Sequence, residues 1–215
     1  MNIKNLNMRW ATRSVRPAAV AGLVLAALGV SACGSDYARQ GEASSYLIIS
    51  ALEGLGVTGT GAGSGTFTPV LRSDVQTHGS VFEDNGRVTM TAAMRDASVN
   101  ANGPTTNNLI TVNRYHVAFR RSDGRNTEGV DVPYGFDGAI TFTVGPGDNQ
   151  QVPFSLVRAQ AKLESPLMNL RGLGGSVLIS TIADVTFYGH DQTGRETSVT
   201  GQISVNFADW GDPDN

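Results

Sequence analysis

Cysteine and lysine are the scarcest chemical groups in this sequence of 215 residues. Cys33 is the only cysteine, so an internal disulfide is excluded and the fold must be stabilised by core burial. After residue 32 the only lysine is Lys162, and the only adjacent basic pair is Arg120-Arg121. Proteins that bind nucleic acids need patches of Lys and Arg to neutralise phosphates. We therefore expect no nucleic-acid partner.

The sequence also lacks the usual arrangements of catalytic residues. No Gly-x-Ser-x-Gly motif occurs, and the three histidines, His78, His116 and His190, are far apart. His-x-x-x-His and Cys-x-x-Cys spacings are absent as well. These absences predict a protein that is not an enzyme, with no cofactor and no catalytic residues.

Acidic segments leave calcium binding open as an alternative. The candidates are residues 83–85, residues 123–131, and Asp209 together with Asp212 and Asp214. Calcium takes about six to eight oxygen ligands, often from several loops, and no segment matches the twelve-residue EF-hand loop. Because acidic loops are usually just solvated, our prediction contains no metal site.

The first 32 residues have the layout of an export signal. A basic stretch without acids carries Lys4, Arg9, Arg13 and Arg16, and an apolar run covers residues 18–30. As a helix, this run would be roughly 20 Å long, which is shorter than the roughly 30 Å hydrocarbon core of a bilayer. The pattern favours a signal peptide over a membrane-spanning helix.

The apolar run is followed by Val30-Ser31-Ala32-Cys33-Gly34. Small residues followed by a cysteine resemble the bacterial lipobox, which implies cleavage before Cys33 and attachment of lipid to its sulfur. Two or three acyl chains together anchor a protein stably, so membrane lipid is the expected partner of Cys33. The residue after it, Gly34, is not the Asp of inner-membrane retention, which favours the outer membrane of a cell envelope that has two.

This interpretation divides the chain into three parts. Residues 1–32 are the signal peptide, residues 33–44 a lipidated flexible tether, and residues 45–215 a folded domain. All 19 acidic residues but only 12 of the 16 basic residues follow residue 32, so cleavage changes the net charge from −3 to −7. About 180 residues are enough to bury a core.

Alternation of apolar and polar residues predicts an all-β domain. Turn sequences rich in Gly, Asp and Pro separate the alternating segments, which indicates a sandwich or a barrel rather than a parallel α/β sheet, and we expect a single antiparallel β-sandwich. The seven expected strands cover residues 45–52, 87–96, 108–121, 136–144, 151–158, 176–190 and 196–208.

Two segments depart from simple alternation. In residues 109–121, Tyr115, Val117 and Phe119 share one face, while Ile110 and Val112 fall on the other, which predicts a bulge or a change of sheet. Residues 153–170 begin as a strand but continue with leucines at near-helical spacing. We expect the strand to end near residue 158 and a short helical turn to end near Ser165-Pro166.

Residues 184–196 run from a strand through the turn His190-Asp191-Gln192-Thr193-Gly194-Arg195. This piece resembles the final hairpin of bacterial Ig-like or fibronectin-III-like domains, in which a D-x-x-G-N turn often joins the last two strands. The resemblance implies an Ig-like sandwich. Arg195 departs from that pattern, and the Cys…Trp…Cys core of antibody domains is absent.

Residues 120–136 form a long polar connection and combine aromatic residues with arginines. We select Arg120, Arg121, Arg125 and Tyr134 as a possible ligand loop, because such mixtures suit contact with protein or glycan. The alternative, in which Tyr134 folds the loop over the edge of its own core, is the favoured interpretation. The sequence therefore predicts a lipid-anchored binding or structural module of the cell envelope, with loop-mediated carbohydrate or peptide binding as the alternative.

Overall fold

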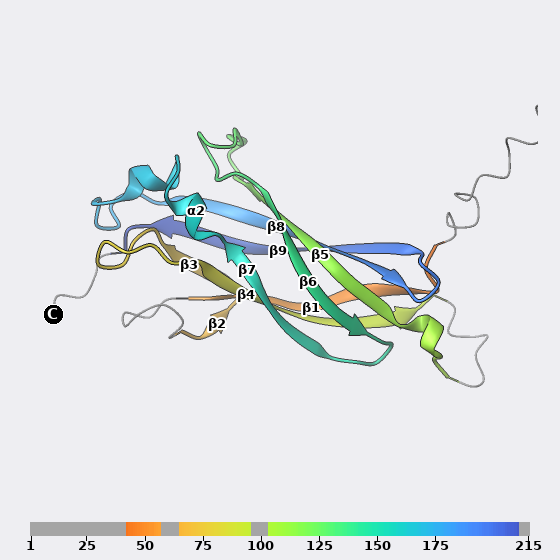
Figure 1. Cartoon of the computed structure of the whole chain (residues 1–215). Helices are drawn as coiled ribbons and strands as arrows, with labels where there is room; N and C mark the ends of the chain where they lie inside the picture. Colours follow the sequence, from red (N-terminus) through yellow and green to blue (C-terminus); the bar gives the residue numbers. More distant parts are fainter. Residues whose placement is uncertain (1–41, 57–64, 96–102, 211–215) are drawn as a thin grey trace, which may run out of the picture. The chain divides into compact units, whose positions relative to one another are not determined.

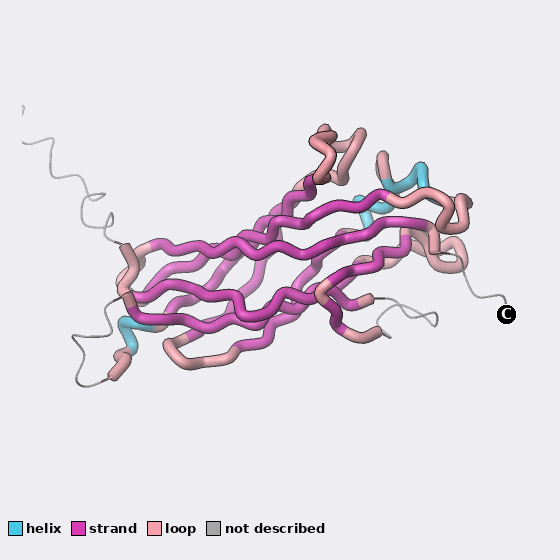
Figure 2. Tube along the Cα trace, turned by 180° about the vertical axis from the view of Figure 1, so that it is seen from behind, coloured by secondary structure: helices cyan, strands magenta, loops and turns pink. Residues whose placement is uncertain are grey.

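The computed structural model describes residues 42–56, 65–95 and 103–210, which belong to one compact unit. Two β-sheets dominate these residues, and the few helical turns lie in the connections (Figure 1). The tube in Figure 2 shows the strands running along the length of this unit, with loops gathered at both ends. The prediction of an all-β fold is confirmed.

The first sheet contains four strands in the order β2-β1-β4-β7, and the second contains five in the order β3-β9-β8-β5-β6. Their bounds are β1 Ser45–Leu55, β2 Phe67–Thr68, β3 Val70–Asp74, β4 Asp84–Met94, β5 Ile110–Arg120, β6 Phe136–Val144, β7 Gln150–Val157, β8 Ile179–Asp191 and β9 Glu196–Ala208. Short helical turns are η2 Thr106–Asn108, α2 Ala159–Lys162 and η3 Leu167–Leu170. The turn α2 follows β7 directly, as predicted. No helix in the described ranges is long and apolar enough to cross a bilayer.

The strand number and the purely antiparallel arrangement were predicted wrongly. All seven expected strands are present, but β2 and β3 add two more, and β3 pairs with β9 in parallel. The chain passes from the first sheet to the edge of the second between β2 and β3, which makes that sheet mixed. The strand expected at residues 176–190 begins at Ile179, so Val177 precedes β8 and is exposed.

The end of the predicted tether packs against the domain. Ala43 is buried and its carbonyl accepts a hydrogen bond from Arg95 Nε, while Ser44 Oγ donates to the carbonyl of Asn107. Arg195 Nη1, from the turn between β8 and β9, donates to the carbonyl of Glu42. Residues 42–44 are therefore part of the folded unit, and the boundary lies before them rather than at residue 45.

The predicted bulge in β5 is confirmed. The register of β5 shifts between Val112 and Arg114 against both of its neighbours, β6 and β8. Against β8 the extra residue is Asn113, which turns the second half of β5 over, so apolar side chains from both halves face the core. Five of them are buried: Ile110, Val112, Tyr115, Val117 and Phe119.

Aromatic rings join the two sheets in the centre of the core. Phe187 of β8 and Tyr115 of β5 belong to the second sheet, and Phe154 of β7 belongs to the first. The ring of Phe154 makes edge contacts with both, at centroid distances of 5.5 Å to Phe187 and 5.3 Å to Tyr115. Edge-to-face pairs stabilise beyond the area they bury.

The turn between β8 and β9 is organised by Asp191. Its Oδ1 accepts hydrogen bonds from the Thr193 N–H, the Thr193 hydroxyl and the Arg195 N–H, and Gly194 has a φ of 83°. The hairpin expected at residues 190–195 is confirmed. Burial acts to raise the pKa of Asp191, but these hydrogen bonds outweigh it and hold the pKa below the ordinary value of 3.8.

The stability of the domain is therefore expected to fall in acid through Asp191. A carboxyl with a lowered pKa in the folded state contributes stability above its unfolded pKa, and this contribution is lost as the pH falls through the folded pKa. We expect the loss of unfolding free energy between about pH 5 and about pH 2 to be smaller in Asp191→Asn than in the wild type. Urea midpoints at several pH values measure this difference. Glu196→Gln, a neighbouring exposed position, is the control, and an equal effect in both variants would contradict the assignment.

Candidate functional site

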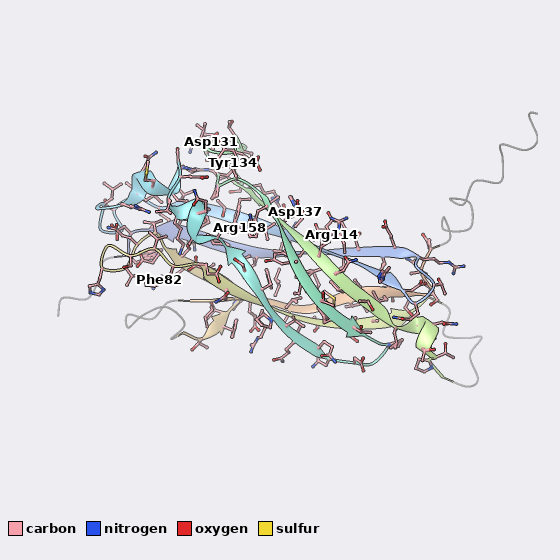
Figure 3. All side chains as sticks on the ribbon, in the orientation of Figure 1. Phe82, Arg114, Asp131, Tyr134, Asp137 and Arg158 are labelled. Atoms are coloured by element: carbon pink, nitrogen blue, oxygen red, sulfur yellow. The ribbon has the colours of Figure 1, made fainter. Side chains whose placement is uncertain are left out.

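Three long connections lie at the same end of the sandwich. They are residues 75–83 between β3 and β4, residues 121–135 between β5 and β6, and residues 158–178 between β7 and β8. The sheet topology requires this, because β3, β5, β7 and β9 all end where β4, β6 and β8 begin. Figure 3 shows Phe82, Asp131, Tyr134 and Arg158 toward this end, which is opposite to Glu42 and the Arg195 turn.

Apolar side chains are exposed on these connections. Of the eleven large hydrophobic residues that are exposed in the described part of the chain, eight belong to the three connections. We call these eight residues the distal surface: Phe82, Val130, Tyr134, Leu163, Met168, Leu173, Val177 and Leu178. Exposed apolar residues scattered singly are ordinary, so it is their occurrence on three connections at one end that makes this end a candidate interaction surface.

A buried ion pair joins the segment 158–178 to β4. Lys162, the last residue of α2, places its Nζ 2.9 Å from Asp84, the first residue of β4. The two side chains are 2 % and 1 % exposed. The hydroxyl of Ser73, on β3, donates a hydrogen bond of 2.6 Å to Asp84 Oδ2. Burial raises the pKa of Asp84, whereas Lys162 and Ser73 act to lower it.

Asp209 and Trp210, which follow β9, form hydrogen bonds with residues of the connections and of β3. Asp209 Oδ2 accepts hydrogen bonds from the Gly172 N–H and from Gln76 Nε2. Trp210 donates from its backbone N–H to Asp74 and from its indole Nε1 to the carbonyl of Ser73. Residues 75–83 and 158–178 are thus both hydrogen-bonded to Asp209, which directly follows β9.

The four residues selected from the sequence are not gathered into one site. Arg121 and Arg125 both bind Asp123, and their hydrogen bonds hold the pKa of Asp123 well below its ordinary range. Arg120 binds Asp184 on the neighbouring strand β8 at 2.7 Å. The ring of Tyr134 lies against Gly129, where a side chain would collide with its hydroxyl.

Val132 of the loop 121–135 is fully buried, and Glu128 accepts a hydrogen bond from the Gly135 N–H within the same loop. The buried residue of the loop is thus Val132, whereas the alternative interpretation assigned the contact with the core edge to Tyr134. Tyr134 and Val130 nevertheless keep exposed faces of 54 % and 66 %, so the loop contributes apolar area to the distal surface.

The acidic residues considered for calcium are engaged in other contacts. Asp84 binds Lys162, Asp123 binds two arginines, and Asp209 binds Gly172 and Gln76, while Asp212 and Asp214 lie outside the described residues. Within the described ranges, no three His, Cys, Asp or Glu side chains lie close enough together to hold a metal ion. Cys33 also falls outside the described part of the chain.

Of the three histidines, His116 binds Asp137 across β5 and β6 with its Nδ1 3.0 Å away, and His78 lies in the exposed turn 77–80. His190 precedes the Asp191 turn on β8. The structure leaves these three residues on separate elements, as their spacing in the sequence suggested.

The sequence analysis did not predict that exposed apolar residues of three connections lie at one end of the domain. The leucines at residues 163, 167 and 170 were interpreted as helical spacing, and only Leu167 and Leu170 are buried. The connections that carry the other apolar residues come together through the strand topology, which single segments do not reveal. No protein-family model matches this chain, and no curated protein matches it.

Proposed function

We propose that this protein is a non-enzymatic, lipid-anchored module of the bacterial cell envelope that binds a partner protein through its distal surface. The observation that carries the proposal is the concentration of eight exposed apolar residues at the end opposite to Glu42. An Ig-like sandwich fits this role, because such domains commonly present recognition loops at one end. The polar rim of the surface, with Arg125 and Asp131, is typical of protein interfaces.

The position of the distal surface relative to Glu42 supports the same function. Cys33 precedes Glu42 by nine residues in the sequence. The longest strands have 13 residues and extend about 40 Å along the two sheets. The distal surface therefore lies about one strand length from the first described residue after the expected lipid on Cys33, and a lipid-anchored domain can present it to a protein of the envelope. Gly34 after Cys33 favours the outer membrane.

Lipid attachment is tested by Cys33→Ser in the full chain, expressed in a bacterium that processes lipoproteins. The wild type is expected to incorporate radiolabelled palmitate and to fractionate with membranes, whereas the variant incorporates none. A thioether forms only on the cysteine sulfur, so serine cannot replace it. Equal labelling of the two chains would contradict the anchor.

The partner is tested by photo-crosslinking in the same cells. A photoreactive phenylalanine analogue at Leu173, which is 40 % exposed, is expected to give a defined adduct with another protein. The same analogue at Tyr46 is the matched control, because Tyr46 is 41 % exposed but lies at the start of β1, near Glu42. No adduct at Leu173, or the same adduct at both positions, would contradict a role of the distal surface.

A further inference from the structure

A polar groove of about 310 Å³ crosses the outer face of the second sheet, away from the distal surface. Three neighbouring strands contribute to it: Asn113 and Arg114 from β5, residues 188–190 from β8, and residues 196–198 from β9. In the registers of these strands, Arg114 stands beside Tyr188, and Tyr188 stands beside Ser198. All three therefore project from the same face, opposite to the buried side chains of Tyr115 and Phe187.

The β5 bulge creates this groove. Without the extra residue, one of Asn113 and Arg114 would point inward, but in the bulge both side chains are exposed. Gly189 is required at the same point of β8, because a Cβ there would lie 2.6 Å from the carbonyl oxygen of Thr111. The bulge and this glycine let the backbones of β5 and β8 approach closely and leave a hollow beside them.

Arg114 is the cation of the groove. Its guanidinium carbon lies 3.7 Å from the centroid of the Tyr188 ring, so one planar face of the guanidinium is covered. The N–H groups lie in the plane of the guanidinium, so stacking on the ring leaves them available for hydrogen bonds. In the described part of the chain Arg114 forms no ion pair with a carboxylate, in contrast to Arg87, Arg95 and Arg120. A stacked guanidinium with free N–H groups suits two-point binding of a carboxylate or phosphate.

The remaining lining residues suit hydroxyl groups. The Asn113 amide, the Ser198 and Thr197 hydroxyls and the Glu196 carboxylate supply both donors and acceptors. His190 also lines the groove, and its Nδ1 is shielded from solvent and has no hydrogen-bond partner among the described residues. A volume of this size is at the lower end of the range for small-ligand sites.

We propose that this groove binds a small acidic sugar, whose carboxylate or phosphate is held by Arg114 and whose hydroxyl groups are held by Asn113, Glu196 and Ser198. The anionic group and the hydroxyl groups must belong to one molecule, because the cation and the polar lining residues occupy one hollow. This site is independent of the distal surface and of lipid attachment.

Calorimetric titration of the full-length chain in detergent tests the proposal. The probes are galacturonate, glucose 6-phosphate, glucose and inorganic phosphate. At least one acidic sugar is expected to bind more tightly than glucose and than inorganic phosphate, and the comparison of galacturonate with glucose 6-phosphate identifies the anion. Arg114→Gln is expected to weaken this binding by about tenfold or more, since hydrogen bonds to charged groups are among the strongest.

Arg72→Gln is the matched control, because Arg72 also stacks on an aromatic ring, that of Trp210, at 4.1 Å but lies outside the groove. It is expected to bind the acidic sugar as the wild type does. The His190 ring signals in NMR spectra report whether the bound sugar lies in the groove. Absence of binding by both acidic sugars, equal binding of glucose, or equal affinity of Arg114→Gln and wild type would overturn the proposal.

Discussion

Replacing Asp84 with alanine is expected to lower the free energy of unfolding by about 3–5 kcal/mol. The carboxylate is 1 % exposed and is the buried partner of Lys162, which is itself 2 % exposed. Removing the carboxylate leaves the buried ammonium group of Lys162 without its partner, and the desolvation of an unpaired charge makes such a change costly. The Ser73 hydroxyl loses its acceptor as well. Urea denaturation measures the loss.

Two further variants separate the cost of the unpaired charge from the value of the ion pair. Replacing both partners with apolar residues, as Asp84→Leu with Lys162→Met, is expected to be far less destabilising than Asp84→Ala, because no charge is left buried. Glu53→Ala removes the partner of Arg87, a pair that is 24 % and 30 % exposed, and is expected to cost no more than about 1 kcal/mol. A loss in Asp84→Ala no larger than in Glu53→Ala would contradict the role of the buried pair.

The same variant also tests how the distal surface is held. Lys162 belongs to the segment that carries Leu163, Met168 and Leu173, and Asp84 is its buried attachment to the first sheet. Limited proteolysis is expected to cut Asp84→Ala within residues 158–178 more rapidly than the wild type. Faster cleavage at residues 121–135 alone would indicate that the ion pair does not fix this segment.

Strands with one apolar and one polar face were predictable from the sequence. The expected bounds of β6 and β9, residues 136–144 and 196–208, are those observed, because apolar and polar residues alternate through both strands. β3 was missed because its buried positions are Leu71 and Ser73, so only one apolar side chain marks its inward face. Its parallel pairing with β9 joins residues more than 100 positions apart, for which no local pattern exists.

The bulge in β5 was predictable, but its consequence was not. A change of apolar face between Val112 and Tyr115 requires an extra residue, and this is visible in the sequence. The groove beside it also depends on Tyr188 and Ser198, which the register of three strands brings next to Arg114. Likewise, Asp84 and Lys162 are 78 residues apart, and the only local signal was a single lysine between Ala161 and Leu163.

Replacing Phe187 with alanine is the other change expected to have a large effect, with a loss of about 3–5 kcal/mol in unfolding free energy. Phe187 is fully buried and contacts Phe154 of the opposite sheet as well as Tyr115 of its own. The substitution removes a ring from the contact between the two sheets and leaves a cavity that the surrounding strands cannot fill completely. Phe187→Leu keeps most of the volume and is expected to cost no more than about 1.5 kcal/mol.

Phe187 also precedes Tyr188, Gly189 and His190, which line the groove from β8. A cavity beneath this strand would allow it to move inward, whereas Phe187→Leu would hold it in place. We therefore expect Phe187→Ala to weaken binding of the acidic sugar in the folded protein more than Phe187→Leu does, although neither side chain reaches the groove. Urea denaturation gives the stabilities and calorimetry the affinities. If Phe187→Ala is no less stable than Phe187→Leu, the aromatic contact between the sheets is not a main source of stability, and β8 is positioned by its hydrogen bonds to β5 and β9.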